Sequence, residues 1–319
     1  MEVTDIFPNV LEKVRDFADR NPKGVIIIRW PTATWKTDLS IKLAEKLPSE
    51  IISADSRQIY KYMDIWTDKV SKEIRERIPH FQIDIVDPSQ LYTAWERKKD
   101  TENIISNIHS RWKIPIIVWG TWLYIDTIYK NFDMPDVEPD FSLREKLYKE
   151  EEKNPWILYK KLQEVDPLEA QKLHPNTLRY IVRALEIYYK TWKPKSELAR
   201  QRPVKWPLLM IWLRREKEDT NKRINKRIKK QIEMWLVDEV KWLLEQWYSP
   251  DLQSMQWLWY KEIVWYLQGK YDLEKAVEIL KRNTHRYAKR QRTWFRRYIA
   301  ESKQAPRQNV EYLFYNLTR

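Results

Sequence analysis

Short continuous apolar runs alternate with longer segments of helical periodicity in the first part of the chain. The runs at 25–29, 51–53 and 114–118 have the length of buried strands, whereas 37–47 and 94–111 repeat their apolar residues at helical spacing. Buried strands that alternate with helices are typical of a parallel sheet with helices packed on it. The pattern therefore predicts an α/β fold built on a parallel sheet.

The pattern changes along the chain in a way that predicts several regions. Residues 1–23 have the pattern of an N-terminal helical extension, and 24–127 that of the first part of the α/β core. From 128 to 197 the sequence is charged and poor in strands, which predicts an inserted all-helical subdomain. Residues 198–302 complete the core and continue as basic C-terminal helices, and 303–319 form a tail without a clear pattern. The helices expected in the insertion are 143–152, 157–164 and 178–190, and a strand is expected after it at 208–213.

Composition and charge narrow the class of protein. The 319 residues are 43% hydrophobic, which is enough for a packed core, and 59 Lys and Arg against 46 Asp and Glu leave a net charge of +13. This excess favours a polyanionic partner, and nucleic acid rather than a membrane, because no apolar run approaches the roughly 20 residues of a spanning helix. The absence of cysteine excludes disulfides, thiolate metal sites and a cysteine nucleophile. Because the N-terminus has no secretory pattern, we expect a cytoplasmic protein. We also expect a monomer.

Glycine and tryptophan occur in abnormal numbers. The chain has 3 glycines and 18 tryptophans, although a usage of about 7% predicts roughly 22 glycines in a chain of this length. Many of the tryptophans occupy turns and helix ends, where glycine normally interrupts a chain. The tryptophans in such contexts are Trp30, Trp35, Trp66, Trp112, Trp119, Trp122, Trp156, Trp192, Trp212, Trp235, Trp247, Trp257, Trp259 and Trp265. Trp206 and Trp294 have ordinary contexts, and Trp95 and Trp242 fit either description.

Two explanations of these tryptophans are open. Some bacterial lineages read the UGA codon as glycine, whereas the commoner reassignment reads it as tryptophan. A gene of the first kind that is translated with the second code would show tryptophan at glycine positions. The glycine-like contexts favour this explanation. The alternative is a set of surface aromatic side chains that stack on RNA.

The segment after the first predicted strand has the spacing of a phosphate-binding loop. It reads Trp30-Pro31-Thr32-Ala33-Thr34-Trp35-Lys36-Thr37, which becomes G-x-x-x-x-G-K-T when glycine stands at its first and sixth positions. Such a loop turns main-chain N–H groups around a phosphate at a helix N-terminus. Lys36 then supplies a charge to the terminal phosphate, and the Thr37 hydroxyl can bind Mg²⁺. An indole at 30 or 35 would crowd that space, and the alternative is an ordinary strand-to-helix turn.

Several further motifs follow the loop in order. They are Ile52-Ser53-Ala54-Asp55-Ser56-Arg57-Gln58-Ile59-Tyr60, Ile78-Pro79-His80, Asp84-Ile85-Val86-Asp87-Pro88, Gly120-Thr121-Trp122-Leu123-Tyr124-Ile125, Arg183-Ala184-Leu185-Glu186 and Tyr287-Ala288-Lys289-Arg290-Gln291-Arg292-Thr293-Trp294-Phe295-Arg296. Together with the loop, they make the chain resemble the bacterial tRNA dimethylallyltransferases, or tRNA isopentenyltransferases, from about residue 24 to 298. Kinases and ATPases that share the loop lack the later motifs. The resemblance implies a P-loop NTPase-like core.

The resemblance also implies a prenyl transfer to RNA. Members of the family move a dimethylallyl group from dimethylallyl diphosphate to N6 of the adenosine on the 3′ side of the anticodon. The loop with Lys36 would then hold the diphosphate of the prenyl donor, and Thr121 matches a threonine that contacts tRNA near the target base. Asp55 matches the general base, since a carboxylate beside a diphosphate can accept a proton as the amine attacks. The alternative for Asp55 is a carboxylate on the metal side of the loop.

A set of residues matches the tRNA contacts of the family. The helical insertion would grip the anticodon arm, and a base turned out of the anticodon loop would reach the donor through the protein. The C-terminal helix would add a basic face for phosphates, although a solvated helical face is the alternative for any run of charges. The matching residues are Asp55, Ser56, Arg57, Gln58, Thr121, Arg179, Arg183, Gln256, Tyr260, Lys261, Lys289, Arg290, Gln291 and Arg296.

The chain departs from the family pattern at three places. Phe81 follows His80 where the family usually has two histidines, and Tyr180 replaces a frequent arginine. Lys217 stands where the family often has an arginine thought to meet the diphosphate. The four histidines show no metal-ligand spacing, so we expect no zinc site. Two rival functions stay open: a nucleotide kinase that uses the loop with ATP, and a non-catalytic tRNA-binding relative if the tryptophans are real.

Overall fold

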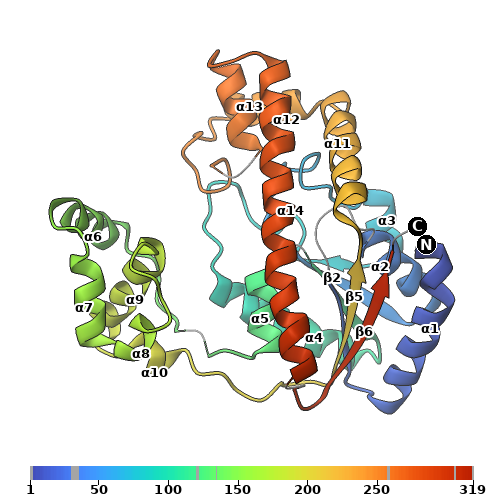
Figure 1. The fold of residues 1–319 in the computed structure, drawn as a ribbon. Helices are drawn as coiled ribbons and strands as arrows, with labels where there is room; N and C mark the ends of the chain where they lie inside the picture. Colours follow the sequence, from blue (N-terminus) through green and yellow to red (C-terminus); the bar gives the residue numbers. More distant parts are fainter. Residues whose placement is uncertain are drawn as a thin grey trace. The chain divides into compact units, whose positions relative to one another are not determined.

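The chain divides into two compact units, which Figure 1 traces. The computed structural model describes residues 3–29, 36–119, 122–133, 135–256, 259–304 and 307–317. One unit consists of Met1–Ile125 with Val204–Arg319, and the other is Asp126–Pro203. The sequence pattern predicts an insertion at 128–197, and the observed unit extends a little beyond it at both ends.

The first unit is built on a parallel sheet, as the apolar runs predict. Its strands lie in the order β3-β2-β4-β1-β5-β6, and every hydrogen-bonded pair of neighbours runs parallel. All five residues of β1 are buried, which explains why four consecutive apolar residues precede its final arginine. The strands are β1 (Val25–Arg29), β2 (Ser49–Ala54), β3 (His80–Phe81), β4 (Ile114–Trp119), β5 (Leu208–Arg214) and β6 (Val310–Asn316).

Strand β1 lies inside the sheet, between β4 and β5, which both follow it in the sequence. In β1, Ile27 lies opposite Ile117 of β4 on one side and Met210 of β5 on the other. The order of the strands therefore reverses at β1, and ligands of parallel sheets bind at the carboxyl ends of strands beside such a reversal. The segment that leaves β1 at this edge is the predicted phosphate loop, whose residues 30–35 lie outside the described part of the chain.

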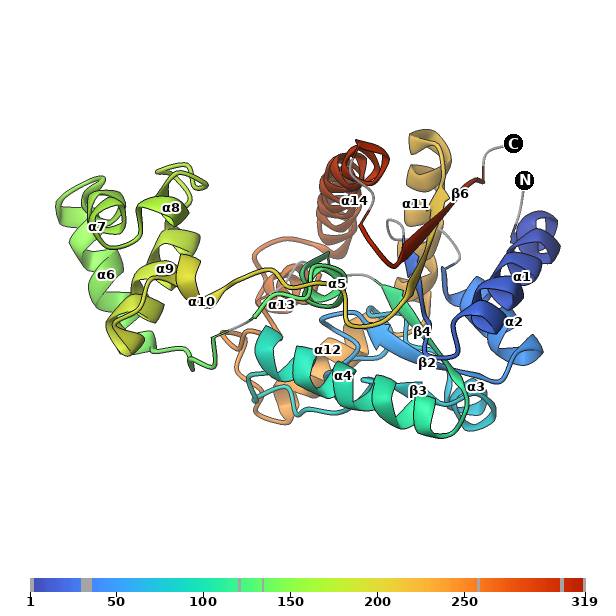
Figure 2. The same cartoon turned by 90° about the horizontal axis from the view of Figure 1, so that it is seen from below.

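Helices pack on the sheet and on one another. A buried stripe of Val3, Ile6, Val10, Val14 and Phe17 runs along α1, and Figure 2 shows this helix lying along α2. The helices of this unit are α1 (Val3–Arg20), α2 (Lys36–Lys46), α3 (Lys72–Arg77), α4 (Ala94–Ser110), α11 (Lys217–Glu233), α12 (Leu236–Glu245), α13 (Tyr260–Leu267) and α14 (Leu273–Gln304), and α5 (Trp122–Tyr129) leads into the second unit. Among the described helices, none has the length and apolarity needed to cross a bilayer.

The end of the chain is a strand, where the sequence shows only a tail at 303–319. Residues of β6 pair with β5 along the whole strand, from Leu208 opposite Val310 to Arg214 opposite Asn316. The exposed Arg20 of α1 binds Glu311 of this strand at 2.8 Å. The described segments near both termini, α1 and β6, therefore belong to the first unit. The pattern is weak because β6 is only partly buried and its partner lies far away in the sequence.

A second apolar core lies beneath the segment that follows β2. Ile59 and Met63 of that segment are buried against Ile224 of α11, Val240 of α12 and Ile263 of α13. The packing fixes the loop after β2 against the C-terminal helices. Two regions far apart in the sequence therefore meet at the edge of the sheet where β2 ends.

The second unit has helices and no extended strands where it is described, apart from a single bridge between Phe132 and Gln201, as predicted for an all-helical insertion. Its core contains Leu147, Leu158, Leu162, Ile181 and Leu185. The helices are α6 (Phe141–Lys153), α7 (Ile157–Val165), α8 (Pro167–Ala170), α9 (Leu178–Thr191) and α10 (Lys195–Leu198). Helices α6, α7 and α9 match the three expected helices to within a few residues, whereas the short α8 and α10 were not expected.

Candidate functional site

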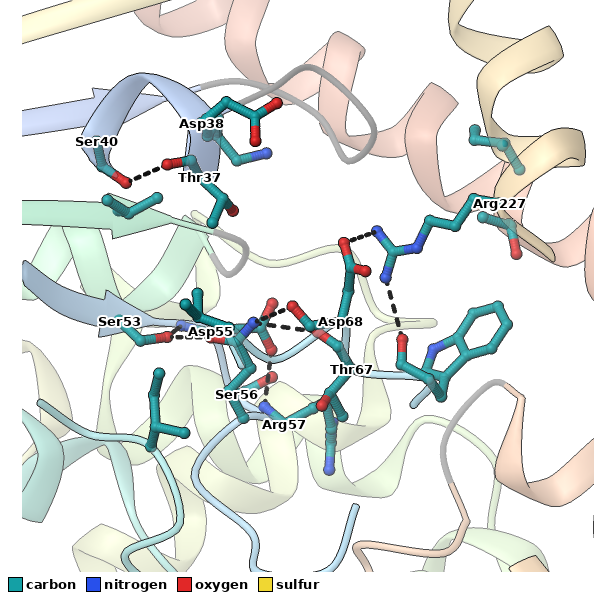
Figure 3. Close-up of a pocket in the computed structure, with 18 of the residues that line it drawn as sticks. Thr37, Asp38, Ser40, Ser53, Asp55, Ser56, Arg57, Thr67, Asp68 and Arg227 are labelled. Carbon is teal, nitrogen blue, oxygen red and sulfur yellow. Dashed lines mark hydrogen bonds and ion pairs between the residues drawn. The ribbon is translucent and has the colours of Figure 1, made fainter. Parts of the chain in front are cut away.

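A pocket of about 340 Å³ lies at the carboxyl ends of β2 and β4, within the first unit. This volume is in the range of sites for small molecules. Figure 3 shows side chains that line it, drawn from the start of α2, the loop after β2 and helix α11. Polar and charged residues of the lining are Lys36, Thr37, Asp38, Ser40, Ser53, Asp55, Ser56, Arg57, Gln58, Thr67, Asp68, His80, Arg223, Arg227, Lys230, Thr284, Tyr287 and Gln291.

Lys36 and Thr37 stand at the first turn of α2, on the α2 side of the pocket. The first N–H groups of a helix have no partners within it, so this end carries a partial positive charge. Burial lowers the pKa of Lys36 to about 7, although the Asp55 carboxylate opposes that shift. Burial therefore disfavours the charged form of this lysine, and an anion beside it would stabilise the charge.

Asp55 lies just past the end of β2, in a loop held by its own hydrogen bonds. Its Oδ1 accepts the Arg57 N–H at 2.8 Å, as a short side chain does in an Asx-turn. The Ser53 hydroxyl donates to Gln58 Oε1 at 2.7 Å, and Gln58 Nε2 donates to the Thr67 carbonyl at 3.1 Å (Figure 3). The structure thus brings Lys36, Thr37 and Asp55 to one pocket, as the motifs predict.

Arg97 of α4 lies behind this loop, and the sequence motifs do not reveal it. The side chain is buried, its Nη1 donates to the Asp55 carbonyl at 3.0 Å, and its Nη2 donates to the Ser53 carbonyl. Its guanidinium also stacks on the Tyr124 ring at 4.4 Å. The available signal was its position in the buried stripe of α4 with Thr101, Ile105 and Ile108. An arginine in such a stripe requires internal acceptors.

Arg223 and Arg227 of α11 bring guanidinium groups to the opposite wall. Arg227 donates to the Trp66 carbonyl at 3.0 Å and pairs with Asp68 at 3.3 Å. The family resemblance places the diphosphate-binding cation at Lys217, but the pocket lining contains these two arginines, further along α11, and not Lys217. They project from the helix beside Ile224 and Ile228, whose burial fixes the rotation of α11.

Oxygen donors around the pocket fit a magnesium ion. They include the Thr37 hydroxyl and the carboxylates of Asp38, Asp55 and Asp68. Burial raises the pKa of Asp38, and the charge of Asp68 adds to the shift, so a cation would stabilise both carboxylates. Mg²⁺ usually takes one or two carboxylates together with substrate phosphates. The described residues include no group of three or more His, Asp or Glu side chains placed to hold a metal by themselves.

The residues that match tRNA contacts fall into different environments. Arg57 and Gln291 are buried and line the pocket, beside Ser56 and Gln58. Tyr260 is buried in the core, and its hydroxyl donates to Glu239 at 2.7 Å, so it offers no surface to RNA in this structure. The exposed residues of the set are Arg179, Gln256, Lys289, Arg290 and Arg296, Lys261 is partly exposed, and Thr121 lies outside the described residues.

One face of α14 is basic and exposed. Arg282, Arg286, Lys289 and Arg290 share this face, at spacings of four, three and one residue. The opposite face is buried at Leu280, Thr284, Ala288 and Gln291, and two of these residues, Thr284 and Gln291, line the pocket. A single helix therefore connects a charged surface with the wall of the pocket.

Arg183 of the second unit has internal partners. Its Nη1 pairs with Glu186, and its Nη2 donates to the Val137 carbonyl at 2.8 Å. Arg144 binds the same carboxylate through two contacts of 2.8 Å. Arg183 therefore stabilises the fold of the helical unit, whereas Arg179, one turn earlier, is exposed.

The all-parallel sheet and the pocket at its carboxyl edge define an α/β protein with a P-loop NTPase-like core. A family model described as IPP transferase matches residues 58–298. The chain therefore belongs to the IPP transferase family.

Relatives and solved structures agree with this assignment. The tRNA dimethylallyltransferase of Thermotoga neapolitana is 46% identical over 272 residues, which are 85% of this chain and 89% of the relative. That of Thermotoga petrophila is 44% identical over 294 residues, 92% of each chain. The tRNA isopentenylpyrophosphate transferase of Bacillus halodurans has a TM-score of 0.63 at 36% identity, covering 92% of this chain and 90% of its own. A eukaryotic dimethylallyltransferase acting on tRNA has a TM-score of 0.75 at 32% identity, covering 91% of this chain and 73% of its own.

Proposed function

We propose that this protein is a tRNA dimethylallyltransferase, which transfers a dimethylallyl group from dimethylallyl diphosphate to N6 of the adenosine 3′ to the anticodon. The observation that supports this function most strongly is the meeting of Lys36 and Asp55 in one pocket, on a chain of the IPP transferase family. A cation for the leaving group and a carboxylate for the nucleophile are the two groups that the transfer requires.

The leaving group would bind between α2 and α11. Lys36 and the first N–H groups of α2 face it from one side, and Arg223 and Arg227 from the other. These positive groups stabilise the charge that develops on the diphosphate as the carbon–oxygen bond breaks. A Mg²⁺ ion held by Thr37 and a neighbouring carboxylate, Asp38 or Asp68, would neutralise part of the same charge.

Asp55 would act on the nucleophile. The N6 nitrogen of adenosine forms a bond to the first carbon of the prenyl chain, the diphosphate departs with the electron pair of the broken bond, and Asp55 takes the proton that N6 loses. The loop that carries Asp55 is fixed by Arg57, Gln58 and Arg97, so the carboxylate is positioned before the substrate arrives.

The RNA would be held by charge on exposed helices. The basic face of α14 offers Arg282, Arg286, Lys289 and Arg290 to phosphates, and the net charge of +13 favours a polyanion. Exposed Arg179 of the helical unit would contact the anticodon arm. A flipped base then reaches a pocket that RNA cannot enter as a paired helix. We propose further that the protein acts as a monomer in the cytoplasm, where its tRNA substrate is found.

Transfer of label tests the reaction. The protein is incubated with an anticodon stem-loop and either labelled dimethylallyl diphosphate or labelled ATP. We expect label in the RNA from the prenyl donor and no transfer from ATP. Phosphorylation of a nucleotide without prenyl transfer would favour the kinase, and tight RNA binding without either reaction would favour the non-catalytic relative.

A further inference from the structure

Six tryptophans have a backbone conformation that normally requires glycine. Their φ angles are positive, a region in which the β-carbon of an L-residue meets its own main chain. Most of the other non-glycine residues with positive φ are Asn, Asp or Gln, small or polar residues of the kind that tolerate this region best. The six are Trp112 (57°), Trp156 (73°), Trp192 (56°), Trp235 (69°), Trp247 (64°) and Trp259 (96°).

The helix ends provide an internal comparison. After α13, the Gly269 N–H bonds to the Tyr266 carbonyl and the Lys270 N–H to the Trp265 carbonyl, the paired bonds of a Schellman motif with glycine at its left-handed position. The same pair of bonds closes α4, from Trp112 to His109 and from Lys113 to Ile108.

Helix α12 closes in the same way. The Trp247 N–H bonds to the Leu244 carbonyl and the Tyr248 N–H to the Leu243 carbonyl. Trp112 and Trp247 thus occupy the position that Gly269 occupies after α13. Trp192, which ends α9, has one bond from its N–H to the Tyr188 carbonyl, the simpler left-handed cap that also favours glycine.

A turn and a helix start repeat the pattern. In Asn154-Pro155-Trp156-Ile157, the Ile157 N–H bonds to the Asn154 carbonyl at 3.2 Å, and Trp156 has φ 73° and ψ 3°. This is a type II turn with proline at its second position, and its third position requires a positive φ and hence favours glycine. Trp259, which precedes α13, has φ 96° and ψ −55°, outside the regions open to L-residues.

Four of these six side chains are mostly exposed and contribute little packing. Trp112, Trp192, Trp235 and Trp247 are 88%, 75%, 71% and 93% exposed. By contrast Trp206, whose context is ordinary, is 8% exposed and has no positive φ. An exposed ring gains too little from burial to offset an unfavourable backbone.

We propose that the working protein carries glycine at these six positions, because its gene encodes them with UGA codons that the organism reads as glycine. The same reading at Trp30 and Trp35 completes G-x-x-x-x-G-K-T, the sequence of a phosphate loop, directly before Lys36. Left-handed caps, a type II turn and a loop motif all require glycine independently of one another.

The proposal changes the pocket, and this consequence rests on the proposed function. The Trp259 indole lines the pocket, stacks on Trp66 with ring centroids 4.3 Å apart, and donates to Thr284 at 2.6 Å. With glycine at 259 this ring disappears from the wall beside Tyr287 and Thr284. The cavity then exceeds about 340 Å³ on the side of α14, where the target base would enter.

The gene and the mass of the native protein test the proposal without any assay of activity. We expect UGA at the six positions and at 30 and 35, and an intact mass below the 39.4 kDa of the printed chain. Peptides that span Trp112 and Trp247 should contain glycine. UGG codons and a mass of 39.4 kDa would overturn the proposal whatever the protein catalyses.

Stability provides a second test with a matched control. The printed chain is compared with a variant that carries Gly for Trp at 112, 156, 192, 235, 247 and 259, and with Trp206→Gly as control. We expect the sixfold variant to unfold at a higher temperature, by on the order of 10 °C, because six left-handed penalties are removed. Trp206→Gly should lower the midpoint because it empties a buried site. A sixfold variant that melts at or below the temperature of the printed chain would contradict the proposal.

Discussion

The helical unit and the pocket of the first unit treat buried charge in opposite ways. In the helical unit, the fully buried Glu186 binds Arg144 through both oxygens, pairs with Arg183 and accepts the Asp140 N–H at 2.7 Å. Burial acts to raise the pKa of Glu186, but these partners outweigh it and hold the pKa below its ordinary value. The charge is satisfied inside the protein.

The pocket of the first unit does the reverse. Burial lowers the pKa of Lys36 in the pocket to about 7, and it also lowers the pKa of Arg97 behind the Asp55 loop, whose Nη atoms donate to neutral carbonyls. An anionic ligand would stabilise the charged form of a cation whose pKa is lowered by burial, whereas a paired ion holds a fold together. The comparison favours a binding role for Lys36 and a structural role for the network around Glu186.

The largest expected effect is the loss of the base. Asp55→Asn keeps the acceptor for the Arg57 N–H but cannot take a proton, so we expect prenyl transfer to fall about 10³-fold while tRNA binding changes little. Single-turnover kinetics and a binding titration measure the two quantities. Asp16→Asn, on the surface of α1, is the control and should match the wild type. An equal loss of transfer and binding in Asp55→Asn would argue against its role as base.

The next effect concerns the residue behind the base. Arg97→Met removes two hydrogen bonds to the carbonyls of Ser53 and Asp55, and a small shift of a reacting group costs about 10²-fold in rate. We expect kcat to fall while KM for tRNA stays constant, with partial rescue in Arg97→Lys. Arg111→Met, which breaks the pair with Glu50 after α4, should lower stability alone. If the activity of Arg97→Met falls only in proportion to the fraction of folded protein, Arg97 has a structural role and does not position the base.

A smaller effect, on stability, tests the helical unit. Glu186→Gln leaves Arg144 and Arg183 without a carboxylate, so we expect a loss of about 3 kcal/mol in the free energy of unfolding at pH 7. The folded-state pKa of Glu186 is lowered. Its contribution to the free energy of unfolding is therefore complete above the ordinary glutamate pKa of about 4.3, and it disappears as the pH falls through the folded-state pKa.

Urea unfolding at both ends of this pH range measures the difference. The gap between wild type and Glu186→Gln should narrow below pH 4. Glu145→Gln, from an exposed pair with Lys149, should cost less than about 0.5 kcal/mol. A gap that does not depend on pH would show that the carboxylate charge is not what stabilises this unit.

The smallest effect lies on the surface of α14. Arg290→Ala removes one exposed cation, so tRNA should bind several-fold more weakly, and the slope of log K against log salt should fall by about 1. Titrations at several salt concentrations measure both. Lys241→Ala on α12 is the matched control. Identical slopes for the two variants would remove this face from the RNA site.

Local patterns predicted much of the fold. The run at 25–29 is a strand with the same bounds in the structure, because a strand buried on both sides needs apolar residues throughout. The strand β6 could not be predicted, since it is half-exposed and acquires its structure from β5, which lies far away in the sequence. Non-local pairing of this kind leaves little trace in a local pattern.

The site was predictable where it depends on motifs. Lys36 and Asp55 follow the carboxyl ends of two strands in one parallel sheet, so their meeting follows from the fold. Arg227 reaches the pocket, and Arg97 reaches the loop that carries Asp55, only through the packing of α11 and α4, which the sequence does not specify locally. Tyr260 matches an RNA contact of the family by motif alone, and its burial and its bond to Glu239 could not be read from that motif.

The most direct measurement uses the protein with glycine at 30, 35 and the six left-handed positions. It is mixed with dimethylallyl diphosphate, Mg²⁺ and an anticodon stem-loop, and the mass of the RNA is followed. We expect the RNA to gain one dimethylallyl group at the adenosine 3′ to the anticodon, with no gain when Asp55→Asn is introduced. RNA that stays unmodified with the glycine form, or is prenylated equally well by Asp55→Asn, would contradict the assignment of this pocket.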